Sequence, residues 1–164
     1  MTSPLKKLIA CLPCPPLWTY NWDALCDLPT LKTWFERMAQ TPQSPIWHGE
    51  GDVMTHTHMV CDALCKLGSF RSLEATSRDT LALAALLHDV GKIKTTRLEE
   101  GEWKAPHHGP VGAQMVRKWL WQEMGLCGNP EMQAFREAVC MLVRHHTTPI
   151  HMMDGNNPSA QALK

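Results

Sequence analysis

An apolar helical face that ends in a histidine and an aspartate restricts the folds open to this chain more than any other feature. From Ser77 onward, apolar residues recur at helical spacing, and the face continues to His88 and Asp89 within the stretch Ala84–Lys92. The sequence therefore predicts a helix that carries an imidazole and a carboxylate at the end of its packed side. This pair of ligand types makes the helix end a candidate metal site.

Histidine is the residue type whose use departs most from an ordinary domain. The chain has nine histidines, which cluster as His56 with His58, His107 with His108, and His145 with His146, with His48, His88 and His151 nearby. Such clustering favours a metal site, because neutral imidazole is a ligand for most transition metals. In the last two pairs we expect His108 and His146 to be the ligands. We interpret His58 and His151 as core or surface residues.

The remaining composition is that of a folded soluble domain. The chain has 164 residues, of which 44% are apolar and 20% are charged, which predicts one domain with a substantial core. Sixteen basic residues balance sixteen acidic ones, so no strong overall field draws the chain to nucleic acid or a membrane. Pro13, Pro15 and Pro16 interrupt the apolar start, which argues against a secretory signal or membrane segment there. Together with seven cysteines, an odd number, this predicts a cytoplasmic location.

The order of helical patterns predicts an all-α bundle. Residues 1–30, rich in proline and tryptophan, are expected to form an irregular arm packed on a domain of residues 31–164. Helices are expected over Leu31–Met38, from a cap at Asp52 to about Leu67, from Ser77 to the His-Asp pair, and over Gly109–Met124 and Pro130–His145. A loop is expected over Gln40–Gly51, and a small hairpin near 95–105. Ligands would project inward from several helices.

These helices would bring imidazoles to one carboxylate. His56 lies in the middle of the second predicted helix and His88 and Asp89 at the end of the third, while His108 opens the fourth and His146 closes the fifth. Nitrogen and carboxylate ligands without a thiolate suit Mn, Fe, Co, Ni or Mg better than a structural zinc. Asp89 has two oxygens and can bridge two ions, which about 3.5–4 Å apart would clamp a phosphate.

Four segments carry a resemblance to a known family. Gly51–Thr57, Leu86–Lys92, His108–Ala113 and Leu142–His146 resemble, in this order, the signature of the HD superfamily of metal-dependent phosphohydrolases, over about residues 45–150. Trp47–Cys61 and Arg136–Arg144 look most like the HD phosphatase domain of bacterial bifunctional RNA end-healing enzymes, in which a polynucleotide kinase follows. The HD domain of bacterial tRNA nucleotidyltransferases is similar too.

The resemblance implies a role for each candidate residue. His56, His88 and Asp89 would bind one divalent ion, and His108 and His146 a second. Lys92 would meet a phosphate oxygen, as a solvent-facing cation aimed at the cleft by a sharp turn at Gly91. Arg144 would also bind substrate phosphate or else be solvated. His48, Glu50 and Asp52 would orient the liganding imidazoles, although capping explains Asp52 equally well.

The implied activity is hydrolysis of phosphoesters of nucleotides or RNA 2′,3′ ends by a metal-activated water, with Asp89 and Lys92 as catalytic residues. The alternative is a non-catalytic HD module that binds a nucleotide or tRNA. The chain contains no GxxxxGK[ST] motif, so a kinase domain would have to be encoded downstream. The family's late aspartate ligand would be Asp154 or would lie beyond residue 164, and we expect the latter, from a truncated reading frame.

Overall fold

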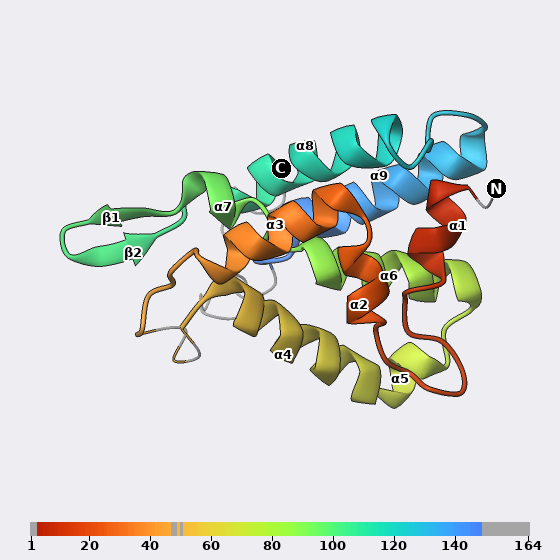
Figure 1. The fold of residues 1–164 in the computed structure, drawn as a ribbon, viewed down its shortest axis with the longest axis horizontal. Coiled ribbons are helices and arrows are strands. Elements are labelled where there is room, and N and C mark those ends of the chain that lie inside the picture. Colours follow the sequence, from red (N-terminus) through yellow and green to blue (C-terminus); the bar gives the residue numbers. More distant parts are fainter. Residues whose placement is uncertain (1–2, 47–48, 50, 149–164) are drawn as a thin grey trace.

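Helices form the body of the molecule and a single short hairpin projects from it (Figure 1). The computed structural model describes residues 3–46, 49 and 51–148. The helices are α1 (Pro4–Ile9), α2 (Trp22–Cys26), α3 (Pro29–Ala39), α4 (Val53–Lys66), α5 (Gly68–Arg71), α6 (Ala75–Leu87), α7 (Lys92–Thr95), α8 (His108–Gln122) and α9 (Pro130–His145); the strands are β1 (Arg97–Glu99) and β2 (Glu102–Lys104). The predicted all-α bundle is confirmed.

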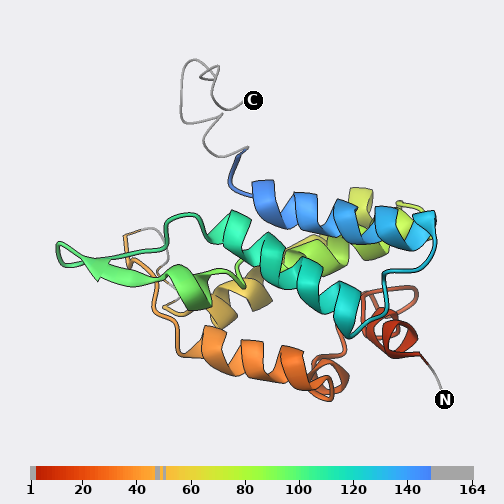
Figure 2. The same cartoon turned by 90° about the horizontal axis from the view of Figure 1, so that it is seen from above.

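Helix α6 is the centre of this bundle, because it packs against both α4 and α9. Its residues Ala82, Leu83, Leu86 and Leu87 are fully buried, as expected for a helix that is apolar on most of its sides. Helix α9 in turn packs along α8, and Figure 2 shows these two helices side by side. The end of α6, and with it Asp89, therefore lies inside the molecule.

Side-chain caps determine where the helices that carry candidate ligands begin. The Asp52 carboxylate accepts a hydrogen bond from the Thr55 amide at 2.8 Å, which starts α4 where the sequence predicted. Asn129 caps α9 in the same way, and Pro130 occupies the first helical position, where its missing N–H costs nothing. Helix α6 begins at Ala75, two residues earlier than predicted, because Glu74 caps it.

The predicted hairpin is also confirmed. Strands β1 and β2 pair antiparallel, with Leu98 opposite Trp103. The two residues between the strands, Glu100 and Gly101, both have positive φ, at 53° and 82°. This backbone matches the right-handed twist of a two-residue hairpin. The hairpin extends away from the helices at the side of α7 (Figure 1).

The segment before residue 31 is more ordered than predicted. Instead of an irregular arm it contains α1 and α2, capped by the side chains of Ser3 and Asn21. The prolines that suggested irregular chain, Pro13, Pro15 and Pro16, lie between the two helices, while Pro4 occupies the first turn of α1, a position that proline tolerates well. The segment does pack on the remaining helices, since the Tyr20 hydroxyl donates to the Ala82 carbonyl of α6 at 2.8 Å. No helix in the described ranges has the length and apolar character needed to cross a membrane.

Candidate metal centre

A buried carboxylate, that of Asp89, lies at the meeting point of four helices. Its Oδ2 atom is 3.2 Å from His88 Nε2 and 3.9 Å from His56 Nε2. Its Oδ1 atom is 3.3 Å from His108 Nε2 and 3.4 Å from His146 Nε2. Two groups of potential ligands therefore share Asp89: one with His56 and His88, the other with His108 and His146. The structure brings together all five residues that the sequence suggested as ligands.

Backbone carbonyls orient three of the imidazoles. The Nδ1 atoms of His88, His108 and His146 lie 2.8, 2.7 and 2.8 Å from the carbonyls three residues earlier in the chain. A carbonyl only accepts, so each Nδ1 carries the proton and each Nε2 turns a lone pair towards Asp89. Metal-bound histidines are held in this way, with the second ring nitrogen donating to a carbonyl or carboxylate.

The atoms around Asp89 Oδ1 fit a cation. This oxygen is buried and accepts no hydrogen bond from the part of the chain that the structure describes. The Nε2 atoms of His108 and His146 approach each other to 3.1 Å, and with both Nδ1 atoms protonated their lone pairs repel. One positive ion among the three atoms satisfies the oxygen and removes this repulsion. The donor set contains nitrogen and oxygen but no sulfur, which suits Mn, Fe, Co, Ni or Mg.

Burial and neighbouring charges shift the pKa values of three residues of the site. Burial alone would raise the pKa of the Asp89 carboxyl, but His88, His146 and Lys92 together hold that pKa well below its ordinary value. Burial lowers the pKa of His108, although Asp89 opposes the effect, and the lower pKa favours the neutral imidazole that binds metal. Burial also acts to lower the pKa of His88, but the adjacent Asp89 outweighs this effect, and the pKa is raised.

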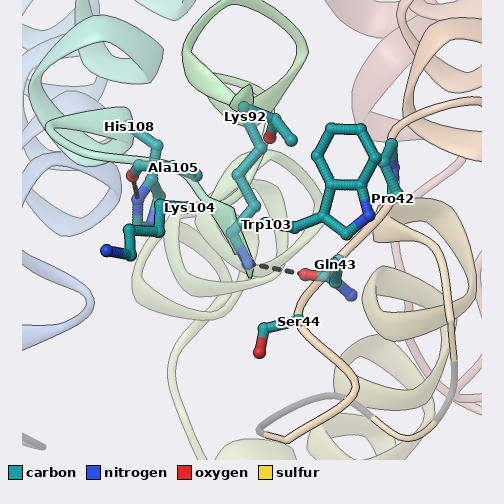
Figure 3. Close-up of a pocket in the computed structure, with 9 residues that line it drawn as sticks. Pro42, Gln43, Ser44, Lys92, Trp103, Lys104, Ala105 and His108 are labelled. Carbon is teal, nitrogen blue, oxygen red and sulfur yellow. Dashed lines mark hydrogen bonds between the residues drawn. The ribbon is translucent and has the colours of Figure 1, made fainter. Parts of the chain in front are cut away.

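Lys92 corrects our prediction of a solvent-facing lysine. Its side chain is buried, with Nζ 2.8 Å from Asp89 Oδ2, and it donates to Gln43 Oε1 at 2.6 Å (Figure 3). Gln43 is itself held, because its Nε2 donates to the Asp52 carbonyl at 3.1 Å. No local pattern indicates Gln43, which is remote from Lys92 along the chain. The ammonium is therefore fixed in position beside the carboxylate.

Glycines allow the backbones that carry these ligands to approach closely. Gly91 has ordinary helical angles rather than the sharp turn we expected. It is needed for space, because a Cβ atom there would lie 2.6 Å from the Gly112 amide nitrogen and would also overlap the His108 carbonyl. At Gly109 a Cβ atom would lie 2.5 Å from the Arg144 carbonyl oxygen. The first residues of α8 therefore pack directly against the turn after α6 and against the end of α9.

The other candidates lie apart from Asp89 or outside the described residues. Asp52 caps α4. His107 and His145 are exposed, so His108 and His146 are the members of their pairs that lie at Asp89. Arg144 is exposed and does not line the cavity at Asp89. The predictions for His48, Glu50 and Asp154 fall outside the described residues.

Comparison with known proteins places this geometry in a family. Residues 53–164 match the HD domain, which is more than half of the chain. The chain belongs to the HD domain family. Members of this family are in general metal-dependent phosphohydrolases, which agrees with the ligand groups around Asp89.

Two relatives carry the same name. The chain is 42% identical over 77 residues to a Multifunctional CCA protein of Halorhodospira halophila, and 32% identical over 107 residues to a Multifunctional CCA protein of Hahella chejuensis. These matches cover 47% and 65% of this chain but only 16% and 21% of the relatives. No solved structure matches the chain significantly.

Proposed function

We propose that this chain is a divalent-metal-dependent hydrolase of phosphoesters, acting on nucleotides or RNA 2′,3′ ends through a metal-activated water. The observation that carries the proposal is the position of Asp89, whose two oxygens face two separate pairs of imidazoles. A carboxylate in this position can bridge two ions, as in other two-metal phosphoryl-transfer sites.

The bound ions would supply the charge that polarises the phosphoryl group and lowers the pKa of the attacking water. His56 and His88 would hold one ion and His108 and His146 the other, with Asp89 between them. The Lys92 ammonium already lies beside Asp89, where it would neutralise charge that develops on a phosphoryl oxygen.

A cavity beside the ligands supports a small-molecule or chain-end substrate. Its volume is about 560 Å³, and Asp89, Lys92 and the four imidazoles line it together with apolar side chains such as Leu81 and Leu142. Ligand pockets of proteins commonly have volumes of about 300–1,000 Å³ with mostly apolar walls and a few polar groups. One nucleotide, free or at the end of an RNA, fits this description.

The RNA-end part of the proposal is supported by likeness to other proteins. The sequence resembles RNA end-healing phosphatases, and both relatives are named Multifunctional CCA protein. A kinase domain encoded downstream remains a prediction, which reading the DNA beyond codon 164 tests directly.

The same relatives favour a second candidate, a non-catalytic HD module that binds a nucleotide or tRNA. In both relatives the matched segment is a small part of a longer protein, whose other parts could carry the catalysis. Metal content distinguishes the two, because the hydrolase must retain divalent ions and a binding module need not.

Activity with and without metal tests the proposal. We expect the purified chain to hydrolyse bis-p-nitrophenyl phosphate, adenosine 2′,3′-cyclic phosphate and adenosine 2′-phosphate with Mn²⁺, Ni²⁺ or Co²⁺, and to lose this activity in EDTA. Asp89→Asn should abolish turnover and metal retention, because it removes the shared ligand. Asp62→Asn, at an exposed position of α4, is the matched control and should behave as wild type. Undiminished turnover in chelator would contradict the metal mechanism.

A further inference from the structure

A second cavity, of about 190 Å³, lies on the hairpin side of Lys92 (Figure 3). Lys92 and His108 line both this cavity and the larger one at Asp89. The two cavities therefore lie on either side of these two residues, which the proposed function places next to the phosphate. A substrate with its phosphate on the hairpin side of Lys92 would have its nucleoside part in the second cavity.

Trp103, on β2, forms one wall of this cavity (Figure 3). Its side chain retains 38% exposure, and its partner across the hairpin, Leu98, is 58% exposed. A tryptophan whose role is to stabilise a hairpin buries its ring against apolar neighbours. More than a third of Trp103 nevertheless remains accessible, and its side chain lines the cavity.

The polar groups around Trp103 favour an anionic, planar ligand. Two lysines, Lys92 and Lys104, line the cavity, and none of its described lining residues is acidic; outside the lining, Lys92 Nζ contacts Asp89 Oδ2 at 2.8 Å and Lys104 Nζ lies 3.9 Å from carboxylate oxygens of Glu99 and Glu100. An indole binds any nucleobase by stacking, because every base has an aromatic face. Lysine binds phosphate as a point charge. An aromatic wall beside two cations is thus suited to a nucleobase joined to a phosphate.

We infer that Trp103 is the stacking platform for the nucleobase of the substrate, at the nucleoside whose phosphate lies beside Lys92. This inference rests on the proposed function. It adds a residue, Trp103, that distinguishes nucleotides from phosphoesters without a base. It applies equally to a free nucleotide and to the last nucleotide of an RNA, since both present a base next to the phosphate.

Paired substrates separate the inference from the proposed function. We expect Trp103→Ala to lower kcat/KM about tenfold for adenosine 2′-phosphate, mainly by raising KM. If RNA ends are the natural substrate, a short RNA with a 2′-phosphate end should show the same loss. Hydrolysis of glycerol 2-phosphate, which has no base, should be unchanged. Trp103→Phe, which keeps an aromatic face, should restore most of the loss.

The control is Trp121→Ala, because Trp121 is 54% exposed and lines neither cavity. An equal loss for both substrates, or the same loss in Trp121→Ala, would overturn the inference. Absence of any metal-dependent hydrolysis in the wild type would instead contradict the proposed function.

A binding measurement tests the platform without turnover. Adenosine carries no phosphate, so it is not a substrate, and its ring should shift the indole N–H resonance that Trp103→Phe removes from the NMR spectrum. Ribose should leave that resonance in place. If millimolar adenosine shifts no Trp103 signal, the nucleobase does not stack there and the inference is wrong.

Discussion

At the scale of single residues, Lys92 has two roles that its position makes inseparable. The ammonium is buried against Asp89 and Gln43, so it compensates the charge of a carboxylate that is itself buried. The same contact places a positive charge at the wall shared by the two cavities. A change at Lys92 is therefore expected to alter both stability and turnover.

Lys92→Ala should lower kcat/KM by about 10²-fold, equivalent to about 2.7 kcal/mol, because the charge on the phosphoryl oxygens loses its partner. It should also lower the free energy of unfolding of the metal-free protein by on the order of 3 kcal/mol, since a buried charge is left unpaired. Steady-state kinetics well below the melting temperature and a urea titration measure the two effects. Lys94→Ala, at an exposed lysine on the same short helix, should change neither. Wild-type turnover in Lys92→Ala would remove Lys92 from the chemistry.

The environment of Lys92 also shows which parts of the site a sequence can indicate. Residue types and order were enough to suggest His56, His88 and Asp89, because ligands of a metal must be particular residues at compatible spacing. The burial of Lys92 depends on Gln43, which comes from a loop before α4 and has no distinctive neighbours. A contact of this kind is determined by tertiary packing and leaves no local pattern.

At the scale of elements, the position of α8 depends on glycines at its contacts with neighbouring segments. Gly91 brings the turn after α6 against the first residues of α8, and Gly109 brings α8 against the end of α9. These contacts hold His108 and His146 beside Asp89. A side chain at either glycine would separate the elements that carry the ligands.

Gly91→Ala should therefore destabilise the fold by about 1–3 kcal/mol or more, because the added methyl overlaps the backbone of α8. The displaced α8 should also weaken metal binding, which calorimetric titration with Mn²⁺ measures. Gly68→Ala is the matched control, because a Cβ atom there meets nothing within 4 Å and the residue has no positive φ. That control should keep wild-type affinity and gain a few tenths of a kcal/mol. Equal melting temperatures for the two variants would show that the close approach is not required.

Prediction of the elements from sequence succeeded where local signals agreed. Helix α9 has the predicted bounds because Asn129, Pro130 and a regular apolar face all indicate the same start. Helices α1 and α2 were missed because short helices depend on packing more than on pattern, and the prolines nearby suggested irregular chain. Helix α5, of four residues, was missed for the same reason.

At the scale of the whole molecule, the candidate metal centre joins helices that are distant in the sequence. His56 comes from α4 and His108 from α8, while His88, Asp89 and His146 directly follow α6 and α9. In the unfolded chain these ligands are far apart, so divalent metal binds the folded state in preference. Binding of this kind stabilises the fold in proportion to the logarithm of the metal concentration.

Each Mn²⁺ ion at about one hundred times its dissociation constant should stabilise the fold by about 2.7 kcal/mol, so two ions should raise the melting temperature by about 10–20 °C for a chain of this size. His146→Ala should remove at least half of this rise, because it leaves only the group with His56 and His88 intact. His145→Ala is the matched control, since the neighbouring histidine is exposed and belongs to neither group, and it should keep the full rise. Asp89→Asn should show almost none, because Asp89 belongs to both groups. Thermal unfolding of the four proteins with Mn²⁺ and with EDTA measures these differences. If His145→Ala loses as much of the rise as His146→Ala, the assignment of the second group is wrong.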